Sequence, residues 1–307
     1  MATALRFDGR VAVVTGAGSG LGRAYAREFA RRGAKVVVND LGVSRAGEGS
    51  NSQAADKVVA EIRAAGGQAV ANYNSAEQGD KIIQTAIDSF GRVDIVVNNA
   101  GILRDVTLLK MTEQDWDMVY RVHMKGTFSV TRAAWPHFRK QQYGRVVNTS
   151  SDAGLFGNFG QTNYSAAKMA IHGFTLAAAK EGDKSNIKVN TICPTAASRM
   201  TEGVLSPDVL ELFVPDKVAQ LVVVLTHEST PVTGTVMESG GGLTAMLRWQ
   251  RSKGHIFLDP YTAEDLLKQW ANVSNFEEGV DYPVDPFDTL GKYMSMRMDE
   301  TSRRAKL

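Results

Sequence analysis

The alternation of short apolar runs with longer amphipathic segments constrains this chain more than any other feature. Runs rich in valine, isoleucine and alanine predict buried strands, at Val11–Val14, Val36–Val38, Ala69–Asn72, Ile95–Val97, Val146–Asn148, Val189–Ile192 and Val236–Glu238. Segments with helical periodicity lie between them, at Gly22–Arg32, Gln53–Ala65, Glu77–Phe90, Glu113–Gln141, Tyr164–Lys184 and Asp216–His227. Because strands that alternate with helices pair in parallel through right-handed crossovers, we predict an α/β fold, a doubly wound parallel sheet with helices on both faces.

The alternation ends near Gly242, and the residues beyond it have a different character. The segment 243–307 has too few apolar residues for a core of its own. It nevertheless contains Trp249 and Trp270, large side chains that gain from burial. We therefore predict a doubly wound domain over residues 1–242 and a C-terminal extension over 243–307 that packs on it.

Composition excludes several classes of protein. The formal net charge of the 307 residues is +2, which argues against a nucleic-acid partner. No apolar stretch approaches the roughly 20 residues that cross a bilayer, and Met1–Arg6 lacks the apolar core of a secretory signal peptide. Cys193 is the single cysteine, so no intrachain disulfide forms, and no Cys/His cluster has the spacing of metal ligands. We expect no nucleic acid, membrane or metal.

A glycine-rich loop follows the first apolar run and precedes a helical segment, with the sequence Thr15-Gly16-Ala17-Gly18-Ser19-Gly20-Leu21-Gly22. Gly16 permits a tight turn, Gly20 lets a pyrophosphate approach the backbone, and Gly22 lets the helix pack on the sheet. The helix N-terminus, near Ser19 and Leu21, offers N–H groups and a positive dipole to phosphates. A loop without a ligand is the alternative, but the strand–glycine–helix context favours a Rossmann-type dinucleotide site.

The carboxylate of Asp40 ends the second apolar run, 18 residues after Gly22. In a dinucleotide site it accepts hydrogen bonds from the adenosine ribose and repels the extra phosphate of NADP. Two negative charges about 4 Å apart near a surface cost about 1–4 kcal/mol, or roughly 10- to 1000-fold in affinity. Arg45 is close enough in sequence to offset this repulsion, and an Asp here also serves as a turn residue. The position favours NAD as the cofactor.

Three residues suited to carbonyl chemistry flank one predicted loop. Tyr164 and Lys168 lie four apart, so they share a helix face, and Ser151 follows the strand at 146–148. As a phenolate, Tyr164 takes the alcohol proton; its ordinary pKa of about 10 must fall, and Lys168 with a charged nicotinamide favours that. Lys168 can also bind the nicotinamide ribose, and Ser151 can hold the substrate oxygen. Alone, Tyr-x-x-x-Lys is an ordinary helix face; beside the glycine loop it predicts a catalytic set.

These motifs together resemble the short-chain dehydrogenase/reductase family over residues 7–242. The glycine loop, Asn98-Asn99-Ala100-Gly101, Ser151 and Tyr164-x-x-x-Lys168 occur in the order and at the spacings of that family. The resemblance implies hydride transfer between a secondary alcohol or ketone and a nicotinamide. It also implies a homodimer formed through the long helical segments, here Glu113–Gln141 and Tyr164–Lys184.

The resemblance implies further cofactor contacts. Asn99, Ala100 and Gly101 would line the cofactor cleft, and Asn74 and Ser75 would lie at the adenine. The segment that follows the sixth predicted strand would hold the nicotinamide amide, through Pro194, Ala196, Ala197, Ser198 and Arg199.

One position departs from the family pattern. The fourth catalytic residue of the family is usually an Asn in the helix after Asn98–Gly101, and His123 takes that place here. Histidine can hold a proton-relay water or merely pack against its neighbours. Both readings stay open at this point.

A closer resemblance is to the (3R)-hydroxyacyl-CoA dehydrogenase part of peroxisomal multifunctional enzymes of type 2, also called 17β-hydroxysteroid dehydrogenase type 4. It is carried by the segments Leu5–Val11, Val38–Gly42, Ala71–Tyr73, Asn98–Asp105, Arg121–His123, Gly157–Lys168 and Leu247–Trp249. It implies NAD-dependent oxidation of a (3R)-hydroxyacyl-CoA in fatty-acid β-oxidation. The hydratase of those enzymes is expected here as a separate protein.

The last three residues, Ala305-Lys306-Leu307, resemble the Ser-Lys-Leu address that a peroxisomal import receptor reads. Together with the closer resemblance they predict an enzyme of the peroxisomal matrix. The segment Arg303–Leu307 is expected to be flexible and exposed, and the charged run Asp299–Lys306 fits an unburied terminus.

Three other functions remain open from the sequence. A 3-oxoacyl reductase uses the same catalytic set, although Asp40 disfavours NADPH. A hydroxysteroid dehydrogenase is compatible with every motif. A catalytically silent NAD-binding scaffold is the alternative outside enzymes, since fold does not fix function, and the complete Ser151, Tyr164 and Lys168 set argues against it.

Overall fold

The computed structural model describes residues 4–197 and 211–304. Its sheet contains the strands β1 (Val11–Thr15), β2 (Lys35–Asn39), β3 (Gln68–Asn72), β4 (Ile95–Asn98), β5 (Gly144–Thr149), β6 (Ile187–Thr195), β7 (Val236–Gly240) and β8 (Leu243–Leu247). The spatial order is β3-β2-β1-β4-β5-β6-β7-β8, and each neighbouring pair from β3 to β7 is parallel. The predicted doubly wound parallel sheet is confirmed.

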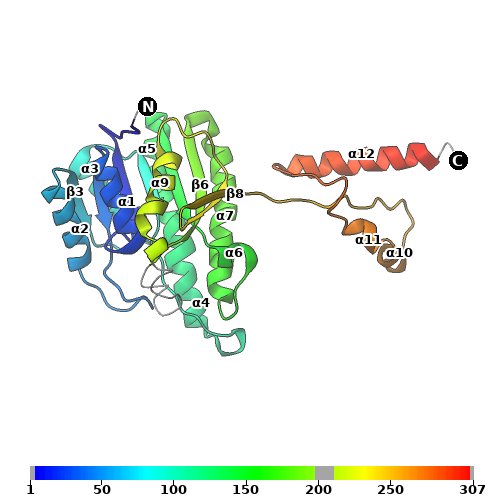
Figure 1. The fold of residues 1–307 in the computed structure, drawn as a ribbon, viewed down its shortest axis with the longest axis horizontal. Helices are drawn as coiled ribbons and strands as arrows, with labels where there is room; N and C mark the ends of the chain where they lie inside the picture. Colours follow the sequence, from blue (N-terminus) through cyan, green and yellow to red (C-terminus); the bar gives the residue numbers. More distant parts are fainter. Residues whose placement is uncertain (1–3, 198–210, 305–307) are drawn as a thin grey trace. The chain divides into compact units, whose positions relative to one another are not determined.

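Helices cover both faces of this sheet (Figure 1). The helices of the first part of the chain are α1 (Gly20–Arg31), α2 (Gln53–Ala64), α3 (Gly79–Phe90), α4 (Glu113–Tyr120), α5 (Gly126–Gln141), α6 (Asp152–Phe156), α7 (Thr162–Gly182) and α9 (Pro215–Thr226). Short turns of other helix types are η1 (Leu108–Lys110), η2 (Arg121–Lys125) and η3 (Asp183–Ser185). Among the described residues, none of the helices is long and apolar enough to span a membrane.

Alternate residues of each strand enter two separate cores. Val14, Val36 and Val38 pack in one cluster with residues of α1, α2 and α9. Val13 and Val37 face the other side and pack with α3, α5 and α7. This period of two is what a strand buried on both faces requires. The continuous apolar runs in the sequence are therefore explained by burial on both faces.

The chain reverses its winding between β1 and β4, which are neighbours in the sheet although β2 and β3 lie between them in sequence. In an open α/β sheet, ligands bind at such a switch point, outside the carboxyl ends of the strands. The glycine loop after β1 and the Asn99–Gly101 segment after β4 both lie at this edge. The topology thus positions the candidate site.

The long helix predicted over Glu113–Gln141 is divided into three segments. α4 and α5 are separated by η2, a π-helical turn that contains His123. A π-turn inserts an extra residue into the hydrogen-bond ladder, and such turns are frequent at functional sites. Periodicity alone did not show this break, because a single inserted residue leaves the apolar pattern nearly unchanged.

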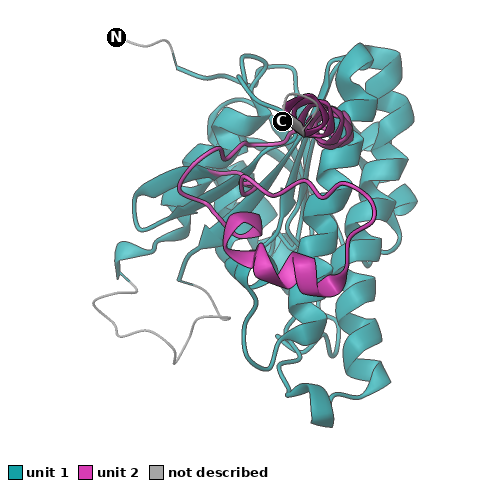
Figure 2. Cartoon of the chain, turned by 90° about the vertical axis from the view of Figure 1, so that its right-hand side faces the viewer, with its two compact units in different colours: residues 1–246 teal, residues 247–307 magenta. Residues whose placement is uncertain are grey.

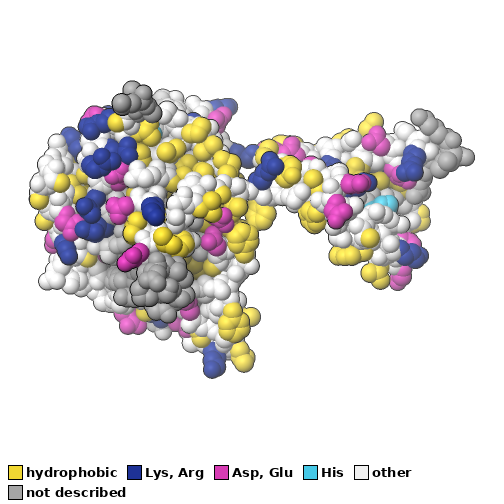
Figure 3. All heavy atoms as spheres, viewed as in Figure 1, with side chains coloured by type: hydrophobic (Ala, Val, Ile, Leu, Met, Phe, Trp, Pro, Cys, Tyr) yellow, Lys and Arg dark blue, Asp and Glu magenta, His cyan; other side chains and the backbone are white. Residues whose placement is uncertain are grey.

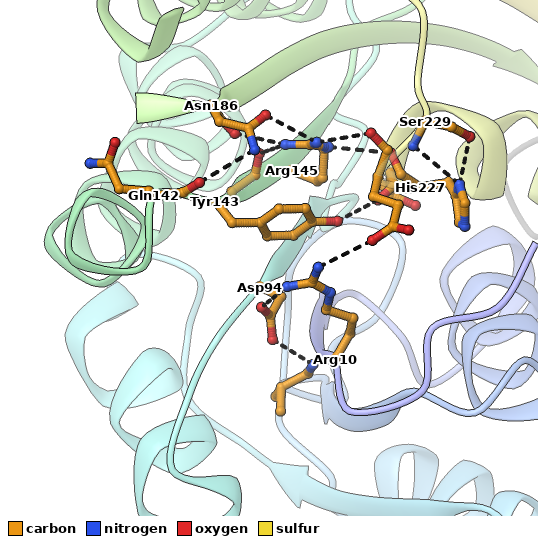
Figure 4. Close-up of polar contacts among 12 residues, drawn as sticks. Arg10, Asp94, Gln142, Tyr143, Arg145, Asn186, His227 and Ser229 are labelled. Atoms are coloured by element: carbon orange, nitrogen blue, oxygen red, sulfur yellow. Dashed lines mark hydrogen bonds and ion pairs between the residues drawn. The ribbon is translucent and has the colours of Figure 1, made fainter. Parts of the chain in front are cut away.

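A cluster of polar residues lies at the amino-terminal edge of the sheet (Figure 4). At its centre is Arg145 on β5, which is 1% exposed. Its guanidinium donates hydrogen bonds to Asn186 O and Gly144 O at 2.7 and 2.8 Å, and at 3.3 Å to His227 O, Glu228 O and Asn186 Oδ1. These contacts join β5 to the chain before β6 and after α9.

The chain divides into two compact units, Met1–Met246 and Leu247–Leu307 (Figure 2). The division falls at the end of β8, four residues beyond the predicted boundary at 242 (246 against 242), because residues after Gly242 add this strand to the sheet. On the face of unit 1 in Figure 3, basic and acidic side chains are interspersed, as the small net charge leads one to expect.

The second unit contains α10 (Ala263–Lys268), α11 (Trp270–Val273) and α12 (Pro286–Arg304). Arg251 holds it together internally: its guanidinium pairs with Asp281 at 2.9 Å, and Lys292 of α12 pairs with the same carboxylate at 3.0 Å. α12 continues to Arg304, so Arg303 and Arg304 of the segment expected to be flexible are helical, and 305–307 lie outside the described residues. That the extension packs on the dehydrogenase body remains a prediction.

Candidate active site

The glycine loop forms a close contact between β1 and the chain after β4. Gly16 has a φ of +63°, and a Cβ on it would lie 2.8 Å from Ala100 Cα. A Cβ on Gly22 would meet the Gly16 carbonyl, so α1 packs tightly beneath the loop. Gly20 also has a positive φ, +52°. Ser19 precedes it with extended backbone at the start of α1. No side chain larger than hydrogen fits at Gly16 or Gly22 without displacing backbone.

The Asn99 segment is fixed to this loop by hydrogen bonds. Asn99 Nδ2 donates to the carbonyls of Thr15 and Gly16 at 3.0 and 3.1 Å. The backbone N–H groups of Asn99 and Ala100 donate to Thr15 Oγ1 at 3.0 and 3.1 Å. Asn98, one residue earlier, donates to Asn148 Oδ1 at 2.8 Å and so joins β4 to β5. These asparagines therefore join the carboxyl ends of β1, β4 and β5.

Asp40 lies at the carboxyl end of β2 and reaches the glycine loop. Its Oδ2 accepts a hydrogen bond from Gly18 N–H at 2.8 Å, and its Oδ1 accepts one from Gly42 N–H at 2.7 Å. A Cβ on Gly18 would lie 2.7 Å from this carboxylate. Asp40 is thus both a turn residue and a wall of the loop, and each of its oxygens keeps a lone pair for a ribose hydroxyl. The residues present fit the adenosine half of a dinucleotide.

The structure brings Ser151, Tyr164 and Lys168 together at the carboxyl ends of β5 and β6. Ser151 begins α6, where its hydroxyl accepts a hydrogen bond from Ala153 N–H at 3.2 Å. Lys168 is 3% exposed, and its Nζ donates to Thr149 O at 2.7 Å. The same Nζ lies 5.4 Å from the centre of the Tyr164 ring. An amine, a phenol and a hydroxyl therefore lie close together at this edge of the sheet.

Burial acts on both titratable groups of this set. It raises the pKa of Tyr164 to about 12, and the nearby Ser151 hydroxyl opposes the shift. It lowers the pKa of Lys168 to about 7. The protein alone therefore shifts Tyr164 away from the phenolate, opposite to the direction that catalysis needs. A positive charge bound beside the phenol would favour the phenolate.

His123 on η2 lies against the catalytic tyrosine. Its ring meets the Tyr164 ring edge to face, with centres 5.3 Å apart. Its Nε2 lies 2.8 Å from Ile102 O and 3.0 Å from Ile102 N. Burial, followed by the charge of Lys168, holds the pKa of His123 well below its ordinary value, so the ring is neutral. Its buried Nδ1 has no hydrogen-bond partner among the described residues.

The remaining predicted cofactor residues also lie at this edge. Pro194 is the last residue but one of β6. Ala196, which follows the strand, is 4% exposed. Ala197 N–H donates to Phe213 O at 2.6 Å. Asn74 and Ser75 follow β3. Gly101 packs against the His123 ring, since a Cβ on it would lie 2.6 Å from the ring. Ser198 and Arg199 lie outside the described residues.

Residues 10–206 match the family model described as short chain dehydrogenase. The chain belongs to the short-chain dehydrogenase family. It is 57% identical over 293 residues to the peroxisomal hydratase-dehydrogenase-epimerase of Neurospora crassa, covering 94% of this chain and 33% of that protein. It is 55% identical to the peroxisomal multifunctional enzyme type 2 of Mus musculus, covering 90% of this chain and 38% of that protein.

A solved relative shows the same fold. The full-length peroxisomal multifunctional enzyme type 2 from Drosophila melanogaster superposes with a TM-score of 0.81 at 43% identity, covering 95% of this chain and 50% of that chain. This chain therefore spans about a third to a half of these relatives, which carry additional parts. The short-chain dehydrogenase fold implies a nicotinamide cofactor.

Some features of this short-chain dehydrogenase site were not predicted from the sequence. Asp152, next to Ser151, has a buried Oδ1 without a partner among the described residues, and burial raises the pKa of its carboxyl. Asn39 and Asn72, at the ends of neighbouring strands, form a buried pair. An asparagine at the end of each of two adjacent apolar runs was a visible signal for the pair. Nothing in the sequence pointed to the environment of Asp152.

Proposed function

We propose that this protein oxidises (3R)-hydroxyacyl-CoA thioesters to 3-oxoacyl-CoA with NAD⁺ as the hydride acceptor. The observation that carries the proposal is the convergence of Ser151, Tyr164 and Lys168 in a chain 57% identical to a peroxisomal hydratase-dehydrogenase-epimerase. The name of that relative includes dehydrogenase activity, and the matched region of this chain contains the catalytic set.

The three side chains have separate roles in this reaction. Tyr164 Oη accepts the proton of the C3 hydroxyl as the C3–H bond of the substrate breaks. Ser151 donates a hydrogen bond to the oxygen that becomes the ketone. Lys168, held by Thr149 O at 2.7 Å, directs its ammonium toward Tyr164 and the nicotinamide ribose. A bound oxidised nicotinamide supplies the hydride acceptor and a positive charge.

The preference for NAD⁺ rests on Asp40. Its carboxylate is held by two backbone N–H groups, so it cannot easily turn away from an approaching 2′-phosphate. The glycine loop and Asn99–Gly101 are assigned to the rest of the cofactor. So are two further segments, Asn74 and Ser75 after β3, and Pro194, Ala196 and Ala197 at the end of β6. A 3-oxoacyl reductase that uses NADPH would need a cation in place of this carboxylate.

His123 is proposed to hold a water molecule beside Lys168. Nε2 lies within hydrogen-bond distance of both Ile102 O and Ile102 N–H, so in either tautomer the buried Nδ1 has no partner among the described residues. A buried polar atom without a partner costs about 1–3 kcal/mol, so a site of this kind usually contains water. The contact between the His123 and Tyr164 rings supports a role for that water near the proton that leaves the substrate. The alternative is that His123 only packs.

The relatives also support an assembly and a location. Trp116, Tyr120 and Phe128 on α4 and α5 are 42%, 49% and 43% exposed, an apolar surface suited to a homodimer. Relatives named as peroxisomal enzymes support a place in the peroxisomal matrix. The proposed address, Ala305-Lys306-Leu307, lies outside the described residues. Imaging of cells that carry the intact chain or one without the tripeptide tests it, and unchanged location after deletion counts against it.

The test of the activity is formation of NADH from (3R)- and (3S)-hydroxyacyl-CoA at several chain lengths. We expect turnover of the (3R) series with NAD⁺ and little with NADP⁺. Turnover confined to hydroxysteroids would indicate a hydroxysteroid dehydrogenase instead. Reduction of 3-oxoacyl thioesters with NADPH alone would indicate a 3-oxoacyl reductase. NAD⁺ binding without turnover of any alcohol would indicate a scaffold.

A further inference from the structure

The residue directly before the catalytic tyrosine is an asparagine buried at the start of α7. Asn163 is the second residue of this helix and is 3% exposed. It neither donates nor accepts a proton in the proposed reaction. Burying an amide is costly unless its polar atoms are hydrogen-bonded, so the burial of this side chain has to be explained by the contacts it makes.

The side-chain nitrogen of Asn163 joins α7 to two segments that are distant in sequence. Its Nδ2 donates to Arg104 O at 3.1 Å and to Asp115 O at 3.2 Å. Arg104 lies after β4, and Asp115 lies in the first turn of α4. An amide nitrogen has two hydrogens, so these bonds use its full donor capacity. One side chain therefore ties the start of the catalytic helix to both segments.

The side-chain oxygen of Asn163 binds the backbone of the tyrosine itself. Its Oδ1 accepts a hydrogen bond from Tyr164 N–H at 2.7 Å. The first N–H groups of a helix have no partner within the helix, and the N-cap of α7, Gln161, makes no side-chain capping bond. Asn163 supplies the acceptor that this N–H group needs. The contact fixes the peptide from which the Tyr164 side chain extends.

The two carbonyls that Asn163 binds belong to residues that are held by a charged pair. Arg104 Nη1 donates to Asp115 Oδ1 at 3.1 Å, and Arg104 Nε donates to Ala46 O at 3.0 Å. The Asp115 carboxylate also forms a capping box with Thr112 at the start of α4. Asn163 therefore connects the catalytic helix to backbone that is itself anchored by side-chain contacts.

We propose that Asn163 is a positioning residue that sets the place of the Tyr164 phenol against the Ser151 hydroxyl, and so the rate of proton transfer. The inference rests on the proposed dehydrogenase function. Asn163 holds the backbone of Tyr164, while His123 packs against its ring. A displacement of about 1 Å at a reacting group can cost about 10²-fold in rate. Loss of Asn163 should slow turnover, whereas the cofactor, assigned to the glycine loop, should keep its affinity.

The test is the substitution Asn163→Leu, which keeps about the size of the side chain and removes its three hydrogen bonds. NAD⁺ binding is measured by fluorescence titration without any acyl substrate, and kcat and KM are measured with the (3R) substrate. We expect kcat to fall at least about tenfold, with the Kd for NAD⁺ and the KM for the substrate within about threefold of the parent. An unchanged kcat overturns the inference.

A second variant, Asn163→Asp, separates the two ends of the amide. A carboxylate keeps the acceptor for Tyr164 N–H but cannot donate to Arg104 O and Asp115 O. We expect its kcat to lie within about threefold of the Asn163→Leu value. Parental turnover in Asn163→Asp would show that the two carbonyl contacts are dispensable, and would reject the inference. The same variant decides the question if Asn163→Leu does not fold.

A matched control separates positioning from general stability. Asn190 of β6 is 0% exposed and also makes three hydrogen bonds, to Val232 O, Thr235 N–H and Thr235 Oγ1. Asn190→Leu should lower the melting temperature, with kcat of the folded enzyme within about twofold of the parent. If Asn163→Leu and Asn190→Leu affect melting and kcat alike, the positioning role is rejected.

The same measurements distinguish the inference from the function on which it rests. Parental turnover in the Asn163 variants of an active parent overturns the inference alone. A parent protein that turns over no alcohol overturns the proposed function, and the inference with it.

Discussion

The two edges of the central sheet differ in how far their buried polar groups are hydrogen-bonded within the protein. At the amino-terminal edge, the fully buried Arg145 donates to four backbone carbonyls and to Asn186 Oδ1. The guanidinium groups of Arg10 and Arg145 both lie over the ring of Tyr143, at 3.8 and 4.2 Å from its centre. Asp94, also fully buried, pairs with Arg10 and Arg92. The buried charges of this edge are satisfied by the protein itself.

The carboxyl-terminal edge leaves buried polar atoms unsatisfied. Within the described residues, the atoms without a hydrogen-bond partner at or near this edge are Asn98 Oδ1, His123 Nδ1, Thr149 Oγ1, Asp152 Oδ1 and Ser165 Oγ. Native structures contain few such atoms, and each needs an explanation. Near the amino-terminal edge, Thr230 Oγ1 is also without a partner among the described residues. The edges therefore differ in degree: the buried charges of one are paired within the protein, whereas the other has more buried polar atoms that could bind a ligand.

The largest effect is expected from Tyr164→Phe at the carboxyl-terminal edge. The substitution keeps the ring against His123 and removes the oxygen that takes the proton. We expect turnover to fall at least about 10²-fold, the low end for acid–base groups, with NAD⁺ binding largely kept. Steady-state kinetics and a titration with NAD⁺ measure the two quantities. Near-normal turnover would remove Tyr164 from the mechanism.

The next effect is expected from Arg145→Met at the amino-terminal edge. Methionine fills part of the space but removes the guanidinium bonds to the carbonyls of Asn186, His227 and Glu228, of which Asn186 O and His227 O each keep one backbone N–H donor. A loss of about 3 kcal/mol in the free energy of unfolding is expected, with kcat of the folded enzyme unchanged. Urea denaturation and kinetics at low temperature test this. A change in kcat with little change in stability would break the contrast between the edges.

Asp40→Ala examines the cofactor choice at the carboxyl-terminal edge. The substitution removes the charge that repels a 2′-phosphate and also the acceptor for Gly18 N–H and Gly42 N–H. The ratio of kcat/KM for NAD⁺ to that for NADP⁺ should fall about tenfold or more. Equal efficiency with both cofactors in the unmodified protein would show that Asp40 is a turn residue only.

The smallest effect is expected from the pair His123→Asn and His123→Leu. Asparagine can still bind a water molecule at this position and leucine cannot, so His123→Asn should retain severalfold more activity if His123 holds a water. The two variants are compared by kcat across pH, with melting temperature as the control for folding. Matching activities would favour the packing role and would make the unpartnered Nδ1 a defect without function.

The fold and much of the site followed from local patterns. The apolar runs predicted strands because each strand of a parallel sheet is buried on both faces. The glycine loop was predictable because Gly16 and Gly22 lie where no Cβ fits, a constraint that acts on single residues. Ser151, Tyr164 and Lys168 were found because their spacing is short in sequence. These are properties that one strand, one turn or one helix imposes on its own residues.

Features that depend on contacts between distant segments, such as hydrogen-bond partners and burial, were decided only by the tertiary structure. The sequence by itself determined the sheet, its glycine loop and the identity of the catalytic side chains, because each is set by local periodicity or by backbone conformation. The tertiary structure decided that Asn163 ties the start of α7 to α4, that His123 presents an unpartnered nitrogen beside Tyr164, and that burial shifts the pKa of Tyr164 upward. Hydrogen-bond satisfaction and desolvation are sums over neighbours from many segments, and no single stretch of sequence contains them.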